Sequence, residues 1–348
     1  MSDLETLPND IILEIFSELS PRETRDLILG LSVLSSKSEN RSLINLLYKR
    51  LFGGKIIVEV YNSQSLTKDT ILTIDSFKDK FYSGDFESKI FLRTRPNIVE
   101  FRFIRRSSDY SNFLGKLYEF NSLLECDNSS FLAYLTMALQ LNFYLDGNLF
   151  LVENPVSFSV IILKILINIS KVKCLSQSLK NLTIKSTDIG ESFVVKWSQL
   201  LERFSNLECL NLANNLIKSS VNYQDDLLCV CFKYPARLKV LNLDRNLINH
   251  LTSDFLEILP HTLEVLLIAD NRLVSLNFEF RGDIRIIECL PNIKRFILNQ
   301  NHFLSYIHPS IFIGAKGIRL EIKGCNLEET NLKELKRLAE VHSFDIIT

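Results

Sequence analysis

The residues best able to do chemistry are histidines, which transfer protons, and cysteines, which act as nucleophiles or bind zinc. None of the five histidines has a serine, cysteine or carboxylate at the spacing of a nucleophile or HExxH motif. They are His250, His261, His302, His308 and His342. Cys229 and Cys231 lack the further ligands of a zinc site, and Gly54-Lys55 lacks the remaining residues of a phosphate loop. The sequence therefore predicts no catalytic residues, no metal site and no cofactor.

The composition of the chain argues against some classes of binding partner. The 348-residue chain carries 40 Lys and Arg against 41 Asp and Glu, so no strong positive field favours nucleic acid or membrane phosphates. The most apolar run, residues 156–169, is interrupted by Lys164 and Asn168 and is too short to cross a bilayer. The seven cysteines are odd in number and form no CxxC pair, and no signal peptide is recognisable at Met1. We therefore expect a cytoplasmic or nuclear protein that binds neither nucleic acid nor membrane.

Internal repeats dominate the second half of the chain. Residues 207–217, 238–248 and 263–273 each fit the pattern LxxLxLxxNxL. Looser copies begin at Leu179, Ile293 and Gly317. The pattern resembles leucine-rich repeats, which implies an α/β solenoid with a curved parallel sheet inside and helices outside. A helix at residues 332–339 and a strand at residues 344–347 are expected to cap its end.

Two polar series recur with the repeats. The pattern asparagines are expected to satisfy buried backbone groups where each strand turns outward, and to have no binding role. They are Asn215, Asn246, Asn271 and Asn301, with Cys325 in the same position. The residue after each first leucine alternates in charge, which predicts sideways ion pairs between neighbouring strands. These residues are Lys180, Glu208, Lys239, Glu264 and Lys294.

The strand positions between the leucines are predicted to face the concave side of the sheet. There Val240, Val265, Leu267 and Ile297 place apolar groups side by side, which is typical of the centre of a protein interface. The alternative is that another segment of the chain covers them. The candidate substrate-binding residues are Val240, Asn242, Asp244, Val265, Leu267, Arg295, Ile297 and Asn299.

The N-terminal residues 7–19 predict an amphipathic helix whose apolar side chains cover about half of its surface. That is more than a helix needs to pack on its own domain. Ser20 and Glu23 form a capping-box pattern at the start of a second helix, and residues 43–52 predict a third. This unit resembles the F-box, although the tryptophan that many F-boxes carry in the third helix is missing. The resemblance rests on Leu7, Pro8, Asp10, Ile11, Ile12, Ile15, Phe16, Leu19 and Pro21.

The F-box resemblance implies docking onto the Skp-type adaptor of cullin-RING ubiquitin ligases through Leu7, Pro8, Ile11, Ile12, Ile15, Phe16, Leu19 and Pro21. The expected domains are an F-box-like helical module at residues 1–52, degenerate repeats with insertions at 53–178, and leucine-rich repeats with a C-terminal cap at 179–348. Together they predict the non-catalytic substrate receptor of an SCF-type ligase, whose repeats bind a protein substrate. Two alternatives stay open: a repeat scaffold or inhibitor with no ligase role, and an adaptor complex that does not lead to degradation.

Overall fold

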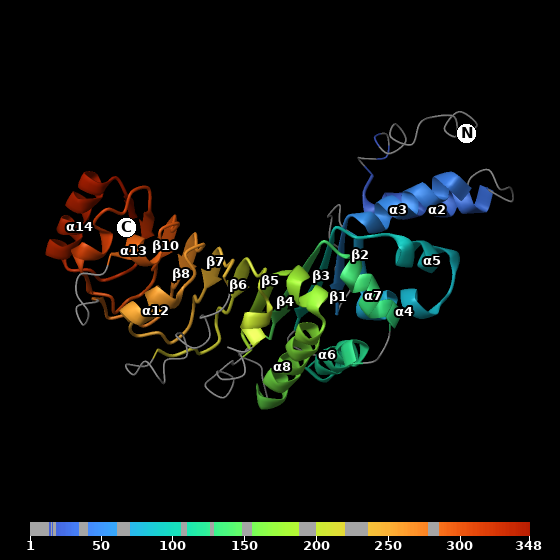
Figure 1. Ribbon diagram of the computed structural model, residues 1–348, viewed down its shortest axis with the longest axis horizontal. Helices are drawn as coiled ribbons and strands as arrows, with labels where there is room; N and C mark the ends of the chain where they lie inside the picture. Colours follow the sequence, from blue (N-terminus) through green and yellow to red (C-terminus); the bar gives the residue numbers. More distant parts are fainter. Residues whose placement is uncertain are drawn as a thin grey trace. The chain divides into compact units, whose positions relative to one another are not determined.

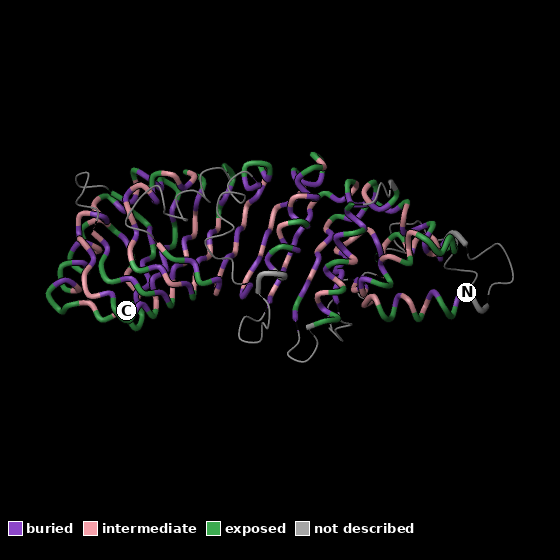
Figure 2. Tube along the Cα trace, turned by 90° about the horizontal axis from the view of Figure 1, so that it is seen from below, coloured by how far each residue is buried: buried purple, intermediate pink, exposed green. Residues whose placement is uncertain are grey.

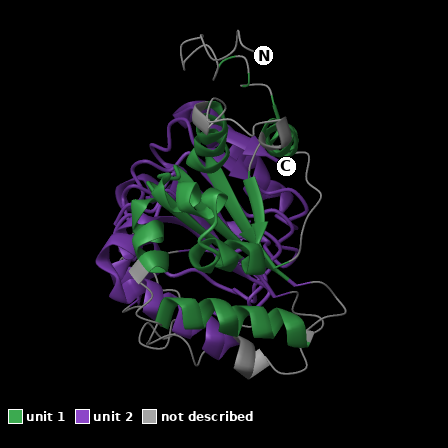
Figure 3. Ribbon diagram, turned by 90° about the vertical axis from the view of Figure 1, so that its right-hand side faces the viewer, with its two compact units in different colours: residues 1–104, 111–144 green, residues 105–110, 145–348 purple. Residues whose placement is uncertain are grey.

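A computed structural model describes residues 14, 16, 19–34, 41–60, 70–105, 110–125, 129–147, 155–187, 200–219, 236–277 and 285–348 (Figure 1). The chain divides into two compact units, coloured separately in Figure 3. Unit 1 comprises residues 1–104 and 111–144, and unit 2 comprises residues 105–110 and 145–348. These limits differ from the sequence domains, and each unit is described by itself.

Unit 1 begins with a pair of helices, α2 (Pro21–Leu34) and α3 (Arg41–Gly53). The capping box at the start of α2 is confirmed: the Ser20 backbone N–H donates to Glu23 Oε2 at 2.8 Å, and the Glu23 N–H donates to Ser20 Oγ at 3.3 Å. The two helices bury a common apolar cluster against which Phe16 packs. Its buried members are Ile28, Leu31, Leu43, Ile44 and Leu47.

The rest of unit 1 consists of short strands and of helices that follow them in pairs. In chain order they are β1 (Lys55–Glu59), β2 (Thr70–Thr73), α4 (Ile74–Tyr82), α5 (Phe86–Arg93), β3 (Ile98–Ile104), α6 (Tyr110–Glu125), α7 (Ser129–Met137) and β4 (Gln140–Asp146). The spatial strand order is β2-β1-β3-β4, with β1 parallel to both β2 and β3. A simple solenoid adds each strand beside the previous one, and unit 1 departs from that order at β3.

Aromatic rings form the core of unit 1. On β3, Val99, Phe101 and Phe103 are buried and alternate with half-buried residues. The Phe77 ring of α4 lies 5.9 Å from the Phe101 ring, and the Phe120 ring of α6 lies 4.6 Å from it. Such edge-to-face and tilted contacts stabilise beyond the area they bury. The helices are therefore held on one face of the strands by ring packing.

Unit 2 contains short strands separated by helices and turns. Before the repeats come α8 (Pro155–Lys171) and α9 (Lys173–Ser178), followed by β5 (Leu179–Lys185), β6 (Cys209–Asn211), β7 (Val240–Asn242), α12 (Ser253–Ile258), β8 (Val265–Leu267), β9 (Ser275–Leu276), α13 (Ile286–Cys289), β10 (Arg295–Ile297), β11 (Tyr306–Ile307), η6 (Pro309–Phe312), β12 (Arg319–Glu321), α14 (Glu329–His342) and β13 (Asp345–Ile347). The strand order β5-β6-β7-β8-β10-β12-β13 follows the chain and is parallel wherever the register is defined. Beside it, β9 and β11 form a parallel pair. This is the predicted repeat solenoid, with the predicted capping helix and final strand at its end.

The core of unit 2 is a row of aliphatic side chains in register. Figure 2 shows buried residues alternating with half-buried ones along the strands. The central position of each repeat strand is fully buried: Leu182, Leu210, Leu241, Leu266, Phe296 and Leu320. Every strand thus contributes one side chain to a continuous stack, so no repeat can bury its apolar face without a neighbour.

The asparagine series has the predicted structural role. Asn246 Oδ1 accepts hydrogen bonds from the backbone N–H groups of Asn215 (3.0 Å) and Ile217 (2.9 Å), while its Nδ2 donates to Leu212 O and Leu243 O. Asn215, Asn271 and Asn301 bond the backbone in the same way, and the Cys325 thiol donates to Leu298 O at 3.3 Å. Each amide therefore satisfies backbone groups of the previous repeat, and Asn246, Asn271 and Asn301 also bond carbonyl groups of their own repeat.

The turn just before each asparagine uses a left-handed residue. Asn214, Arg245, Asp270 and Gln300 have φ between 52° and 60°. Gly324 occupies the same position with φ +70°, and a Cβ there would meet the Gln300 side chain at 2.6 Å. Glycine adopts this conformation without strain, and a larger residue in the last turn would have to displace the Gln300 side chain.

The described residues lack two features that would indicate other functions. Within the described ranges no helix is both long enough and apolar enough to span a lipid bilayer. The same residues contain no group of three or more His, Cys, Asp or Glu side chains placed to hold a metal ion.

Candidate functional site

The strand register of unit 2 fixes which side chains lie beside one another on the face opposite the leucine core, called here the open face. Two rows cross the strands. The first row is Asn181, Cys209, Val240, Val265, Arg295, Arg319 and Asp345, and the second is Thr183, Asn211, Asn242, Leu267, Ile297, Glu321 and Ile347. Neighbouring strands lie about 4.8 Å apart, so members of a row contact one another.

The first row contains an apolar stretch. Cys209, Val240 and Val265 are adjacent in register and half-buried. Burial raises the pKa of the Cys209 thiol, which keeps the thiol neutral. A neutral thiol behaves as a small apolar group, like its two valine neighbours. Leu267 lies beside this stretch in the second row and is also half-buried. Together these four residues, the apolar patch, give the open face a centre that contacts both water and protein.

Ile297 is a correction to the sequence expectation, because it is only 6% exposed and is not part of the accessible patch. Its neighbours on the same strand, Arg295 and Asn299, both bond to Glu321, its partner in register on β12. Arg319 Nε lies 3.2 Å from the same carboxylate. These polar side chains surround Ile297 and shield it from water. Burial raises the pKa of Glu321, but the hydrogen bonds from Arg295 and Asn299 outweigh it and the net pKa is lowered.

The predicted polar contacts Asn242, Asp244 and Asn299 already have partners within the fold. Asn242 Oδ1 accepts from the Asp244 N–H at 2.8 Å, and Asn299 Oδ1 accepts from the Lys323 N–H at 2.7 Å. Asp244 Oδ1 accepts from the Ala269 N–H at 2.6 Å. Burial raises the pKa of Asp244 in spite of this bond. These side chains hold the strand ends and form a rigid polar border beside the apolar patch.

The charge-alternating series pairs across strands as predicted. Lys180 and Lys239 both contact Glu208, with Nζ–O distances of 3.3 and 2.8 Å, and Lys294 contacts Glu264 at 2.6 Å. The hydrogen bond from Lys239 lowers the pKa of Glu208. The pairs neutralise one border of the sheet, so no ligand is needed to explain these charges.

The predicted adaptor-binding residues fall partly within the described chain. Leu7, Pro8, Ile11, Ile12 and Ile15 lie outside the described residues. Phe16 packs against the α2–α3 cluster, the Leu19 carbonyl accepts from Arg50 at 3.4 Å, and Pro21 is the first residue of α2. The Phe16 side chain therefore packs on the α2–α3 pair. Leu19 and Pro21, at the start of α2, are half-buried.

Three contributors to the open face lie at the concave positions of the repeat pattern but outside the candidate substrate-binding set. Cys209 extends the apolar stretch, while Arg319 and Glu321 form the charged network at its end. All three occupy the between-leucine positions of their repeats. Applying the same phase to every repeat, including the loose copy at Gly317, is the signal that selects them.

Comparison with known proteins assigns no family. No family model matches the chain, and no curated protein matches it. Among solved structures the chain is similar to that of the TLR13-ssRNA13 complex, with 16% sequence identity and a TM-score of 0.30. That similarity covers 59% of this chain and 39% of the other, so the chain spans well under half of that protein's length. The solenoid and its open face therefore stand on the geometry of this chain alone.

Proposed function

We propose that the chain is the substrate-recognition subunit of an SCF-type ubiquitin ligase. Its N-terminal helices dock onto the Skp-type adaptor, and the open face of unit 2 binds a protein substrate. Ubiquitin transfer belongs to other subunits, so this chain acts by raising the effective concentration of its substrate at the ligase.

The observation that supports the binding role is the apolar patch Cys209, Val240, Val265 and Leu267. Four adjacent, half-buried apolar groups lie in register, with Arg295 beside Val265 and the polar border of Asn242 and Asp244 next to them. An apolar centre with a charged and polar rim is the usual anatomy of a protein interface. The register holds the patch rigid, which limits the entropy lost on binding.

The ligase role is supported by the helical pair that precedes the strands. The capping box of Ser20 and Glu23 and the cluster beneath Phe16 give a compact α-helical module next to the F-box-like residues. In the proposed role this module only positions the chain on the adaptor, which requires no catalytic groups.

A separation-of-function variant tests the substrate half of the proposal. The double substitution Val265→Asp and Leu267→Asp places two charges in the patch, and we expect it to lose the proteins that co-purify with the wild-type chain. Adaptor co-purification should persist, and the lost proteins should become longer-lived in cells. The matched control is Val274→Asp with Phe303→Asp, which adds the same charge at residues 54% and 64% exposed outside the repeat strands. The patch is not the binding site if both variants lose the co-purifying proteins equally, or if neither variant loses them.

A further inference from the structure

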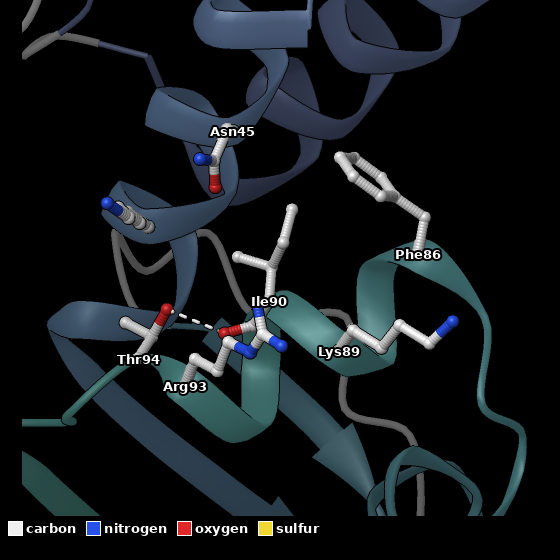
Figure 4. Close-up of a pocket in the computed structure, with 7 residues that line it drawn as sticks. Asn45, Phe86, Lys89, Ile90, Arg93 and Thr94 are labelled. Atoms are coloured by element: carbon white, nitrogen blue, oxygen red, sulfur yellow. Dashed lines mark hydrogen bonds between the residues drawn. The ribbon is translucent and has the colours of Figure 1, made fainter.

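A pocket of about 420 Å³ lies in unit 1 between α3 and α5 (Figure 4). Asn45 and Lys49 line it from α3, and Phe86, Lys89, Ile90 and Arg93 line it from α5. This volume lies within the range of pockets that hold ligands or partner side chains. None of the lining residues belongs to the open face or to the F-box-like motif.

The pocket carries positive charge that no carboxylate of the described residues neutralises. Lys49, Lys89 and Arg93 are exposed, none of the lining residues is acidic, and no carboxylate among the described residues pairs with the three cations. Five other cations of unit 1 form ion pairs: Lys55 with Glu100, Lys78 with Glu119, Lys80 with Glu87, Arg102 with Glu59 and Lys116 with Asp75. The pocket thus brings together three cations for which the described residues supply no carboxylate.

Helix stability explains only one of these cations. Arg93 lies in the last turn of α5, where a positive charge favours the helix dipole. Lys89 lies one turn earlier on the same face, and like charges four residues apart destabilise a helix. Lys49 lines the same pocket from α3. An anion bound between the three would relieve this repulsion.

One part of the pocket wall is apolar. Phe86 and Ile90 point from α5 toward α3 in Figure 4. Ile90 is 7% exposed, whereas Phe86 is 52% exposed although its ring meets Tyr48 edge-on at 6.3 Å. An aromatic side chain left half open beside three cations matches a ligand that is both acidic and partly apolar.

We propose that this pocket binds an acidic segment of a protein partner, with an apolar side chain against Phe86 and Ile90 and carboxylates facing Lys49, Lys89 and Arg93. A peptide fits these features better than nucleic acid does. Single-stranded nucleic acid needs a groove of cations that follows a phosphate backbone, and the pocket is confined within a chain of net charge −1. The proposal does not involve the open face, and it holds whether or not the helical module that contains α3 docks onto the adaptor.

Fluorescence anisotropy with the full chain tests the proposal. The probe is a short labelled peptide of Asp and Glu flanking a Leu-Leu pair, compared with a peptide in which Asn and Gln replace the acidic residues. We expect micromolar binding of the acidic peptide that weakens as salt increases, and a loss of at least about tenfold in the triple variant Lys49→Gln, Lys89→Gln, Arg93→Gln. Phe86→Ala should weaken the same peptide but leave unchanged the binding of one whose leucines are replaced by glycine.

The matched control neutralises three exposed lysines elsewhere, Lys316, Lys323 and Lys336, which gives the same change in net charge. Its affinity should equal that of the wild type, and circular dichroism should show the same folded signal for all variants. Equal affinity in the pocket and control variants, or no binding of the acidic peptide by the wild type, overturns the proposal. A single-stranded oligonucleotide that binds through the same three cations more tightly than the peptide overturns it as well.

Discussion

Units 1 and 2 both use parallel strands, but they stabilise them by different means. Most of the fully buried aromatic side chains among the described residues belong to unit 1, among them Phe77, Phe91 and Tyr134, whereas fewer, such as Phe296, belong to unit 2. Unit 2 instead stacks leucines and inserts a buried asparagine at each turn, such as Asn246, which is 3% exposed. Aromatic packing has no period in sequence. An amide that must bond the backbone of two repeats recurs with every repeat.

This contrast explains why one unit can be read from the sequence and the other cannot. The repeat strands, the asparagine series, the ion pairs of Glu208 and the capping helix α14 follow from local spacing, and the structure confirms them. The strand order of unit 1 depends on β1 pairing with both β2 and β3, and no local pattern specifies that.

Two features of the sites were also beyond the sequence, for a related reason. Ile297 is buried because Arg295, Asn299 and Glu321 meet around it from two strands. The pocket that contains Lys49 and Lys89 lies between helices about forty residues apart in the chain. Its only sign in the sequence is a pair of like charges, Lys89 and Arg93, at helical spacing. Contacts between segments that are distant in the chain leave no periodic pattern in the sequence.

The largest expected effect is in the aromatic core. Phe77→Ala removes a ring that contacts Phe81, Phe91, Phe101, Phe131 and Tyr134, so we expect a loss of about 3–5 kcal/mol in unfolding free energy. Hydrogen exchange read by mass spectrometry should show lost protection in unit 1 strands and little change in β7 and β8. An equal loss in both units would mean that the two cores are not separate.

A smaller but more specific effect is expected in the asparagine series. Asn246→Ala leaves the N–H groups of Asn215 and Ile217 buried without their acceptor, which should cost about 3 kcal/mol of unfolding free energy in urea titrations. The control is Asn242→Ala, where the lost bond to Asp244 is only partly buried and should cost about 1 kcal/mol or less. Similar costs for the two variants would contradict the structural role of the series.

The smallest effect concerns the ion pairs at the sheet border. The pKa of Glu208 is lowered in the folded protein, so its pairing stabilises the fold above its unfolded pKa near 4.5 and is lost as the pH falls through the folded value. Thermal unfolding of the wild type should lose more stability between about pH 5 and pH 3 than Glu208→Gln does, by less than about 1 kcal/mol because the pair is partly exposed. Parallel pH curves for the two proteins would show that the pairs contribute nothing.

The most direct test of the central claim is calorimetric titration of the intact chain with a purified Skp-type adaptor. We expect binding with a dissociation constant below about 1 µM, as a standard interface supports, and its loss in Leu7→Ala/Pro8→Ala. The control Val341→Ala, at a residue 61% exposed on α14, should bind as the wild type does. No detectable heat of binding by the intact, folded chain would contradict the ligase role and leave a repeat protein that binds partners without the adaptor.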